Sequence, residues 1–287
     1  MSPDDTLINR RQRRSALITP ALRPDRYVNA LTCGAAVAIV DLEDSVAVDK
    51  KYDARQMAAE FFSLQVETET VRGIRINALT TEHGLRDLLT IADWPSKPIS
   101  ILVPKADSPR DFDIVAEILD RDDYKPLLYA LIETPRAVAD VQTIAAHNRV
   151  AGLSFGAADY AMMIRATRES MPLLSARQAI VNAAHRHGKM AVDSPFFELE
   201  DTDSLIRETA SAKSWGFHAK GAVHPSQIEV IDSWFAPTPE EIRVAYEILE
   251  SGALDSGIAN INGRMVGAPI AEDAHKTVQE YERGSNV

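Results

Sequence analysis

Residues 127–155 read LLYALIETPRAVADVQTIAAHNRVAGLSF, and this stretch decides the fold. It contains two short apolar runs, Leu127–Glu133 and Val150–Phe155, separated by a polar segment with a helical pattern. Neither run alternates apolar with polar residues, which is typical of parallel strands buried on both faces. Thr134 and Pro135 directly follow the first run, and proline favours the first position of a helix. The stretch therefore predicts a strand, a helix and a second, parallel strand.

The same arrangement recurs along the rest of the chain. Six further apolar runs precede polar segments and helical patterns. These runs are Ser15–Thr19, Ala36–Asp41, Val71–Asn77, Ile99–Pro104, Lys189–Asp193 and Phe217–Val223. Eight strands that alternate with helices predict an α/β protein. We expect a (β/α)₈ TIM barrel, with a doubly wound sheet as the alternative.

Two additional helical patterns follow the eighth run. The first extends over 238–252 and the second over about 268–282, with the small-residue segment Ser256–Gly267 between them. We therefore expect residues 1–235 to form the catalytic barrel domain and residues 236–287 to form a C-terminal helical extension. Helices beyond a closed barrel need a surface to pack on, so we expect the extension to lie on the barrel mouth or on a neighbouring subunit.

The composition excludes several classes of protein. The 287 residues include 42 acidic and 31 basic side chains, and the net charge of −11 argues against a protein that coats nucleic acid. The single cysteine, Cys33, allows no intramolecular disulfide and no zinc site built on cysteines. The polar residues 1–5 predict no signal peptide, and no stretch approaches the roughly 20 apolar residues that span a bilayer. We expect a cytoplasmic protein that binds a small molecule, with no nucleic-acid or membrane partner.

In a barrel of this kind the active site lies at the C-terminal ends of the strands. Polar residues at or next to those ends, together with one arginine at the entrance to the first strand, are therefore candidate site residues. They are Arg14, Asp41, Glu43, Asp44, Arg75, Asn77, Lys105, Glu133, Asp159, Asp193 and His224.

Two of these acids, Glu133 and Asp159, end successive strands, which are neighbours in a barrel. Carboxylates placed in this way can hold Mg²⁺, which keeps several water ligands for a substrate to displace. Alternatively, either acid caps a helix or pairs with Arg75 or Lys105. The spacing alone leaves these interpretations open.

The basic residues also have two interpretations. A guanidinium among apolar neighbours must be paired, so Arg75 binds either a structural acid or a substrate carboxylate in a bidentate fork. Lys50, Lys51 and the arginines around Arg14 are typical of solvated charges. Near the rim, however, they could hold the phosphates of a nucleotide-tailed substrate.

Motifs of other enzyme classes are absent from the sequence. It has no Gly-rich phosphate loop and no G-x-G-x-x-G after a strand, so ATP and NAD chemistry lack support. It also has no G-x-S-x-G, the nucleophile elbow of many hydrolases.

From about Arg14 to Ile270 the chain resembles the citrate lyase β-subunit-like (CitE-like) proteins, the CoA-ester branch of the HpcH/HpaI aldolase/citrate lyase family. The motifs that carry the resemblance are Arg13-Arg14-Ser15 with Thr19-Pro20, Asp41-Leu42-Glu43-Asp44-Ser45-Val46 with Lys50-Lys51 and Ala54-Arg55, Arg75-Ile76-Asn77, Val103-Pro104-Lys105, Ile132-Glu133-Thr134-Pro135, Gly156-Ala157-Ala158-Asp159-Tyr160, His224-Pro225-Ser226-Gln227-Ile228 and Asn262-Gly263-Arg264-Met265-Val266.

The resemblance implies a barrel that assembles into homotrimers or homohexamers. It also implies Mg²⁺-dependent cleavage or formation of a carbon–carbon bond in malyl-, citramalyl- or citryl-thioesters. Carried over position by position, the metal ligands are Glu133 and Asp159, and Arg75 is both catalytic and substrate-binding. Glu43 and Asp44 support catalysis. The further substrate-binding candidates, some of them for the CoA phosphates, are Arg14, Lys50, Lys51 and Lys105.

Three positions depart from the family pattern. Ala21 replaces a usual glycine, and Ala158 replaces a common glutamate. Gly267 stands where many thioester lyases of the family carry an aspartate that reaches a neighbour's active site. With these departures, the resemblance still implies a β-hydroxyacyl-CoA lyase that yields a 2-oxo acid and an acetyl-type thioester, and the change at Gly267 favours the first of two alternatives. The alternatives are a metal-dependent 2-oxo acid aldolase without CoA and a non-catalytic subunit that binds acyl-CoA or an oxo acid.

Overall fold

The computed structural model describes residues 14–167, 171–252, 258–261 and 263–285. Eight parallel strands close into a barrel in chain order, which confirms the predicted (β/α)₈ fold. Strand β1 pairs with both β2 and β8, and its pairing with β8 closes the barrel. The strands are β1 Ser15–Pro20, β2 Val37–Asp41, β3 Val71–Arg75, β4 Ser100–Val103, β5 Leu127–Ile132, β6 Val150–Phe155, β7 Met190–Asp193 and β8 Ala219–Ala222.

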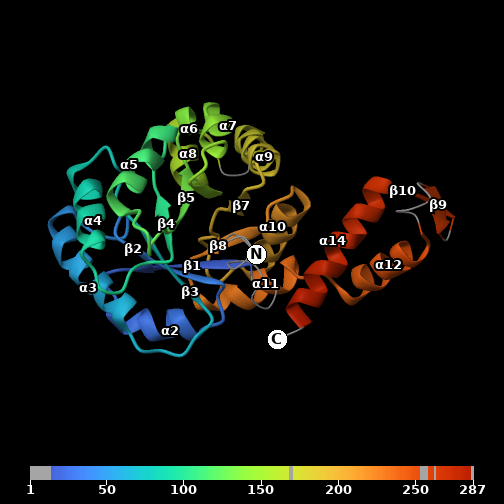
Figure 1. The fold of residues 1–287 in the computed structure, drawn as a ribbon, viewed down its shortest axis with the longest axis horizontal. Helices are drawn as coiled ribbons and strands as arrows, with labels where there is room; N and C mark the ends of the chain where they lie inside the picture. The colour runs from blue at the N-terminus through green and yellow to red at the C-terminus, as the bar shows by residue number, and fades with distance from the viewer. Residues whose placement is uncertain (1–13, 168–170, 253–257, 262, 286–287) are drawn as a thin grey trace.

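Helices surround the strands as a ring that runs from α2 to α11 (Figure 1). The α-helices of this ring are α2 Tyr27–Thr32, α3 Lys51–Ser63, α4 Glu82–Ala92, α5 Pro109–Leu119, α6 Pro135–Ala139, α7 Val141–Ala145, α8 Ala157–Ile164, α9 Met171–Arg186, α10 Thr202–Ser214 and α11 Ile228–Phe235. Short 3₁₀ helices are η1 Pro24–Arg26, η2 Val48–Lys50 and η3 Pro225–Gln227. Among the described residues, no helix combines the length and apolar character that crossing a bilayer demands.

Successive side chains of each strand face opposite sides of the barrel wall. On β1, Leu17 packs against the surrounding helices in the main apolar core, whereas Ile18 faces the barrel axis. On β6, Leu153 likewise packs against the helices, and Ser154 faces the barrel axis. The core between sheet and helices therefore uses one set of positions, and the other set lines the axis.

Several helices begin almost directly after a strand because local hydrogen bonds cap them. The hydroxyl of Thr134 accepts from the backbone N–H of Ala137 at 2.9 Å and starts α6. Ser108 and Asp111 form a capping box at the start of α5. These short transitions hold the residues at the strand ends on one rim of the barrel.

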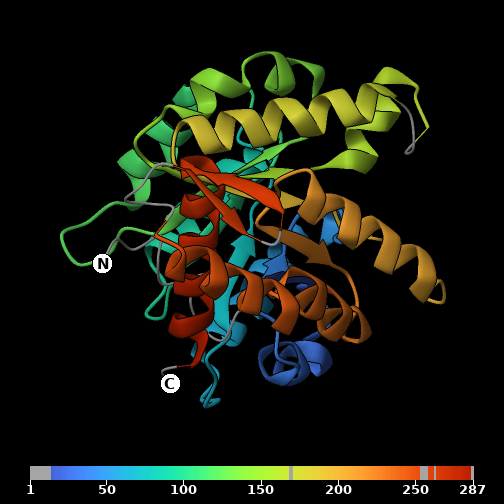
Figure 2. The ribbon, with the colours of Figure 1, turned by 90° about the vertical axis from the view of Figure 1, so that its right-hand side faces the viewer.

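The C-terminal extension has an apolar core of its own. It comprises α12 Pro239–Glu250, β9 Ile258–Ile261, β10 Arg264–Gly267 and α14 Ala268–Ser285. Its buried side chains are Ala245, Ile248, Val266, Ala271, Ala274 and Val278. Helices α12 and α14 pack side by side (Figure 2). Both expected helices are present, close to their predicted limits.

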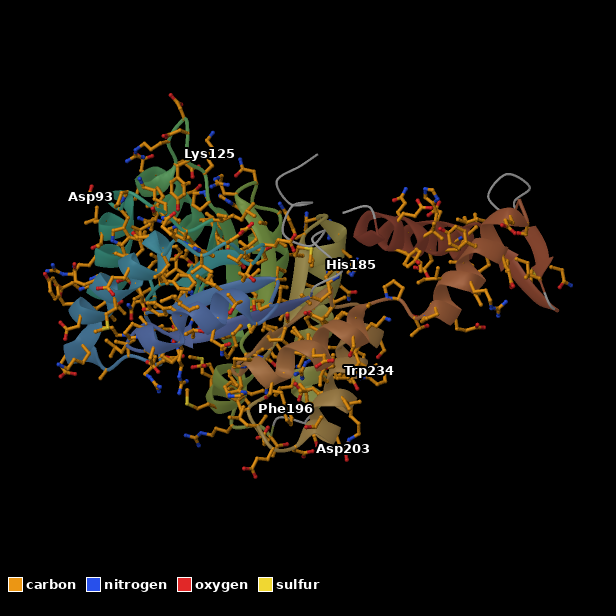
Figure 3. The ribbon with its side chains drawn as sticks, turned by 90° about the horizontal axis from the view of Figure 1, so that it is seen from below. Asp93, Lys125, His185, Phe196, Asp203 and Trp234 are labelled. Carbon is orange, nitrogen blue, oxygen red and sulfur yellow. The ribbon has the colours of Figure 1, made fainter. Side chains whose placement is uncertain are left out.

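The extension lies outside the ring of barrel helices, beyond α10 and α11 (Figure 1). Seen from below, it projects past the labelled His185 of α9 and Trp234 of α11 (Figure 3). An ion pair of 3.6 Å between Lys213 and Glu241 joins α10 to α12. Within one chain the extension therefore does not cover the barrel mouth, and its packing on a second chain stays a prediction.

The segment between the two C-terminal helices contains a structure that the sequence reading missed. Strands β9 and β10 pair antiparallel, with Met265 opposite Asn260 and Gly267 opposite Ile258. Gly263 has a φ of +81°, a conformation that glycine adopts without strain. The sequence Asn262-Gly263 is a typical hairpin signal that could have predicted this turn.

Candidate active site

The last residues of β2 and β3 form a buried ion pair at the rim. Asp41 and Arg75 are register partners, and Arg75 donates from Nε to Asp41 Oδ1 at 2.6 Å and from Nη2 to Oδ2 at 2.8 Å. Asp41 is fully buried. Burial alone would raise the pKa of Asp41, but the charge and hydrogen bonds of Arg75 hold it below its ordinary value. The pair thus fixes the Arg75 guanidinium at the end of the barrel.

This geometry decides between the two interpretations of Arg75. Its bidentate fork is occupied by a structural acid, and its Nη1 lies 3.1 Å from Glu43 and 3.3 Å from Asp44. Arg75 nevertheless lines the central cavity. Asp41 occupies the side of Nε and Nη2, so a ligand carboxylate could meet only the outer Nη1–Nη2 edge of the guanidinium, where Glu43 and Asp44 also lie.

Lys105 connects two of the rim acids. Its Nζ donates to Glu43 Oε1 at 2.5 Å, and its backbone N–H donates to Glu133 Oε1 at 2.9 Å. Burial would lower the pKa of Lys105, but the hydrogen bond and charge of Glu43 raise it above its ordinary value. The residue has a φ of +49°, a strained conformation for a residue with a side chain. This backbone conformation points the N–H of Lys105 at the Glu133 carboxylate.

Glu133 and Asp159 face the same cavity, as their positions on neighbouring strands predict. Burial raises the pKa of Glu133 to about 8, and the charges of Glu43 and Asp159 add to the effect. Gly156 packs so closely that a Cβ at this position would lie 2.6 Å from Glu133 Oε2. The carboxylate of Asp159 has no hydrogen-bond or ion-pair partner within the described part of the chain.

The donor set at Glu133 and Asp159 fits Mg²⁺. In proteins, Mg²⁺ is usually held by one or two carboxylates, and waters and substrate complete its shell. No cluster of three or more His, Cys, Asp or Glu side chains suited to a metal exists among the described residues. The alternative that Asp159 caps a helix is not observed, since no side chain forms a capping hydrogen bond at the start of α8, where Gly156 is the N-cap residue. The alternative pairing of Glu133 with Lys105 Nζ is long, at 4.0 Å.

The cavity that joins these groups has a volume of about 420 Å³ and opens at the C-terminal ends of the strands. Arg26, just after β1, and Asp44 line it and are exposed. The side chain of Arg26 has no ion-pair or hydrogen-bond partner among the described residues, and its backbone N–H donates to the carbonyl of Arg23 at 2.9 Å. The sequence analysis does not predict Arg26 as a site residue, because it considers the arginines around Arg14, which precede the first strand. Arg26 could have been predicted, since residues 21–26 directly follow that strand and so lie at its C-terminal end.

Three predicted substrate-binding residues lie apart from this group. Arg14 lies at the N-terminal end of β1, and its backbone N–H donates to Asp232 at 2.7 Å. Lys51 is buried and donates to the carbonyl oxygens of Leu42 and Glu43, both at 2.7 Å. Lys50 is exposed beside Asp53. Lys51 therefore holds the loop after β2, and of the predicted cations only Arg75 and Lys105 join the acids. The arginines 10, 11 and 13 lie outside the described residues.

Asn77 and Asp193, two further rim candidates, bind elsewhere. The side chain of Asn77 donates to Asp87 of α4 at 2.7 Å, because β3 ends at Arg75 and its alternation stops there. Asp193 is fully buried between Arg177, at 2.9 Å, and Lys220, also at 2.9 Å. His224 caps η3. None of the three lines the central cavity.

Comparison with known proteins agrees with this arrangement. Residues 14–225 match the model of the HpcH/HpaI aldolase/citrate lyase family. The citrate lyase subunit beta of Escherichia coli (strain K12) is 31% identical over 95% of this chain and 94% of its own length. The mitochondrial citramalyl-CoA lyase of Homo sapiens is 27% identical over 93% of this chain and 84% of its own length.

A solved structure with the same architecture is the CitE protein from Mycobacterium tuberculosis in complex with magnesium, acetoacetate and coenzyme A. It has a TM-score of 0.80 and 27% sequence identity, and the match covers 94% of this chain and 98% of that one. The matched residues 14–225 include every strand of the barrel and the acids and cations at its rim. The chain therefore belongs to the HpcH/HpaI aldolase/citrate lyase family.

Proposed function

We propose that the protein is a Mg²⁺-dependent carbon–carbon lyase. Its substrate would be a β-hydroxyacyl-CoA thioester of the malyl, citramalyl or citryl type, and its products a 2-oxo acid and an acetyl-type thioester. One observation carries the proposal: Glu133, Asp159 and Arg75 line a single cavity at the catalytic end of the barrel. The names of the E. coli and human relatives and the ligands of the M. tuberculosis protein belong to the same chemistry.

Glu133 and Asp159 would hold the cation. Bound there, Mg²⁺ would supply Lewis-acid polarisation of the hydroxyl and carboxylate on the carbon that becomes the oxo group. Lys105 would keep Glu133 oriented through its backbone N–H. The close approach of Gly156 would hold the same carboxylate from the other side.

The remaining rim residues would manage charge and protons. Cleavage breaks the bond between the hydroxyl-bearing carbon and the carbon next to the thioester. The hydroxyl proton passes to a base, and the electron pair passes to the thioester as an enolate, whose carbon then takes up a proton to give the acetyl-type thioester. Arg75, held in place by Asp41, would offset that negative charge. Asp44, with a 51% exposed side chain at the cavity mouth, is the carboxylate we assign to proton transfer, while the buried Glu43 positions Arg75 and Lys105.

The CoA portion would leave through the mouth of the cavity. Arg26 is exposed there and is placed to meet a phosphate, whereas Arg23 already pairs with Asp25 at 2.6 Å. This assignment replaces Arg14, Lys50 and Lys51 as the first candidates for CoA binding.

We also propose that the protein is a homotrimer or homohexamer. The extension lies outside the ring of barrel helices, and its hairpin exposes Ile258 (66%) and Met265 (71%). Position 267 lies on that hairpin. In such an oligomer, a side chain at position 267 would therefore reach the active site of a neighbouring chain. Light scattering at micromolar concentration should give the mass of three or six chains, and a monomer would contradict this.

Gly267 is the observation that favours the second candidate, a metal-dependent 2-oxo acid aldolase without CoA. A carboxylate at this position could exchange protons at the thioester methyl, a contribution of about 10²–10⁴-fold, and glycine cannot do so. If the protein does act on CoA thioesters, Gly267→Asp should raise the rate of thioester substrate cleavage. Rapid exchange of acetyl-CoA methyl protons with solvent in the native protein would show that Asp44 or Glu43 has taken this role.

The test compares ligands and variants. Release of a 2-oxo acid from malyl-, citramalyl- and citryl-CoA is measured with and without Mg²⁺. Mg²⁺ binding is measured by calorimetry in Glu133→Gln and Asp159→Asn, with the exposed Glu117→Gln as the matched control. We expect both site variants, but not the control, to lose Mg²⁺ and activity while they stay folded. Unchanged Mg²⁺ affinity in both would remove the metal assignment.

Thermal stabilisation separates the candidate functions, because a ligand that binds the native state raises the midpoint. Stabilisation by CoA thioesters with Mg²⁺, together with turnover, supports the lyase. Stabilisation by pyruvate or oxaloacetate alone supports the aldolase. Stabilisation by CoA thioesters without turnover of any substrate supports the non-catalytic binding subunit.

A further inference from the structure

The cavity does not end below the rim acids but continues along the barrel axis. Its lower part, which we call the axial cavity, is lined by inward-facing residues of β1, β2 and β4 to β8. On the side of β2, β4 and β5, the bulky Ile39, Leu102 and Leu131 pack together, with Val37 and Tyr129 against them. On the side of β6, β7, β8 and β1, the lining residues include Ser154, Met190, Val192, Gly221 and Ala16. The axis of a TIM barrel is usually filled by layers of bulky side chains. A continuous hollow at this place therefore requires an explanation.

Exposure within single strands shows that the axis is hollow. On β6, Leu153 is fully buried against the helices, but its neighbour Ser154 is only partly buried. On β7, Ala191 and Val192 differ in the same way. Inward-facing residues are remote from the outer surface, so the area they expose is the wall of the axial cavity.

Small residues leave the axis open on one side of the barrel. Bulky branched side chains dominate packed barrel axes. Here Ala16, Ser154, Ala219 and Gly221 occupy inward positions on β1, β6 and β8. They lie on the side of β6, β8 and β1, and only Ser154 of β6 is directly beneath the two acids. One cavity is lined both by these residues and by Glu133 and Asp159. The empty space is therefore contiguous with the proposed metal site.

The axial cavity is apolar, which restricts what it can hold. In the part of the barrel that the structure describes, its one charged lining residue is Arg14, at the far end. The nearer polar groups are hydroxyls, such as those of Ser154 and Tyr129. A phosphate or a second carboxylate would be desolvated there without a charged partner. The charged tail of a CoA ester must therefore leave upward, past Arg26.

We propose that the axial cavity binds an alkyl substituent on the 2-oxo acid half of the substrate, a proposal that rests on the proposed function. The carboxylate and oxo oxygens would stay at the cation that Glu133 and Asp159 hold, and the alkyl chain extends down the axis. Pyruvate alone would leave part of the cavity unfilled, because the whole cavity, rim included, has a volume of about 420 Å³, within the range of pockets that hold much larger ligands. The preferred product is thus a longer, straight-chain 2-oxo acid.

Burial of each further methylene should tighten binding about three- to fourfold while the cavity still has room. The experiment measures, by calorimetry with saturating Mg²⁺, the Kd of straight-chain 2-oxo acids from pyruvate to 2-oxooctanoate. Each titration is repeated without Mg²⁺ as a blank. We expect Kd to fall in steps over the first few added carbons and then to level off or rise.

Two variants at one position locate the effect. Ser154→Leu adds volume beneath the metal site, so the ratio of pyruvate Kd to long-chain Kd should fall to about one. Ser154→Ala adds none and should keep the dependence on chain length. Should Ser154→Leu fail to fold, Val192→Phe fills the same space from β7.

The outcomes separate the two proposals. Mg²⁺-dependent binding of pyruvate with no gain from longer chains overturns the axial site but leaves the proposed function intact. If longer 2-oxo acids bind more tightly by the same factor in the native protein and in a folded Ser154→Leu variant, the axial site is also overturned, because the alkyl chain then binds elsewhere. Failure of every 2-oxo acid to bind with Mg²⁺ removes the proposed function and this inference with it.

Discussion

The contact between Gly156 and Glu133 yields the sharpest prediction. A Cβ on Gly156 would lie 2.5 Å from Glu133 Cβ and 2.6 Å from its Oε2. The φ of Gly156 is −95°, which alanine can also adopt, so Gly156→Ala introduces a steric conflict without backbone strain. Rotation of the Glu133 side chain can move Oε2 away, but it cannot move Cβ. The ends of β5 and β6 must therefore separate.

The size of that separation sets the expected effect. Carbon atoms in contact are about 3.5–4.0 Å apart, so the two Cβ atoms must move apart by about 1 Å. Mg²⁺ requires ligand distances of about 2.0–2.1 Å in near-octahedral geometry, which a shift of this size disturbs. We expect Mg²⁺ affinity to fall about 10–100-fold, as when the support of a metal ligand is lost. Overpacking should also lower the free energy of unfolding by about 1–3 kcal/mol.

Gly152→Ala is the matched control. Gly152 lies on β6, before Gly156 in the chain, and its Cβ would meet the ring of Tyr129 of β5 at 2.5 Å, away from Glu133. It should lose comparable stability and keep its Mg²⁺ affinity. Calorimetry with Mg²⁺ and urea unfolding of both variants make the comparison. A folded Gly156→Ala protein with native Mg²⁺ affinity, or an equal loss of affinity in both variants, would refute the reasoning.

Three other substitutions test further parts of the structure. Arg75→Lys keeps the charge but loses the two parallel hydrogen bonds to Asp41, so lyase kcat/KM should fall at least about tenfold; near-normal kinetics would reduce Arg75 to a point charge. Lys220→Met removes a cation from the fully buried Asp193, so the free energy of unfolding in urea should fall by about 3–5 kcal/mol, and a loss below about 1 kcal/mol would contradict this account. Burial, with smaller effects from the nearby His185 and Arg14, lowers the pKa of His218 to about 4; the folded protein then binds fewer protons here than the unfolded chain between pH 4 and 6.5, so stability is lost as pH falls through that window, by about 2 kcal/mol at pH 5. The variant His218→Gln should lack this part of the difference between urea titrations at pH 7.5 and 5, and an unchanged difference would count against it.

The barrel itself could be predicted from sequence because its signal is repeated. Eight apolar runs without alternation, each followed by helix punctuation, leave few topologies open. Their predicted limits differ from the observed strands by no more than two residues, as for Val71–Asn77 against Val71–Arg75. The positions of Glu133 and Asp159 on one cavity follow from the same regularity, since successive parallel strands are neighbours.

The direction in which a rim side chain points could not be predicted. A strand buried on both faces is apolar at every position, so its sequence does not tell which residues face the axis. Glu133 follows β5 and lines the cavity, whereas Asp193 ends β7 and is buried behind the barrel wall. One-residue differences in where a strand begins reverse the outcome.

The roles of the basic residues escaped sequence reasoning for a different reason. Lys51 is buried because the loop after β2 folds its carbonyl oxygens over the start of α3. That contact depends on tertiary structure and leaves no periodic pattern. Arg26 and Lys51 carry the same charge and lie close to neighbouring strand ends, yet one is exposed at the cavity mouth and the other holds a loop.

The charges on the rim provide a physical argument for the metal that is independent of any relative. Apart from Arg26 at the cavity mouth, its titratable groups are Asp41, Glu43, Asp44, Glu133, Asp159, Arg75 and Lys105. Carboxylates outnumber cations, and Arg75 and Lys105 are already committed to Asp41 and Glu43. Buried negative charge without a partner is costly, because low-dielectric surroundings cannot solvate it, and this cost is what raises the pKa of Glu133 to about 8. A divalent cation between Glu133 and Asp159 would offset that excess, and the anionic substrate could then bind in a cavity whose own charges would otherwise repel it.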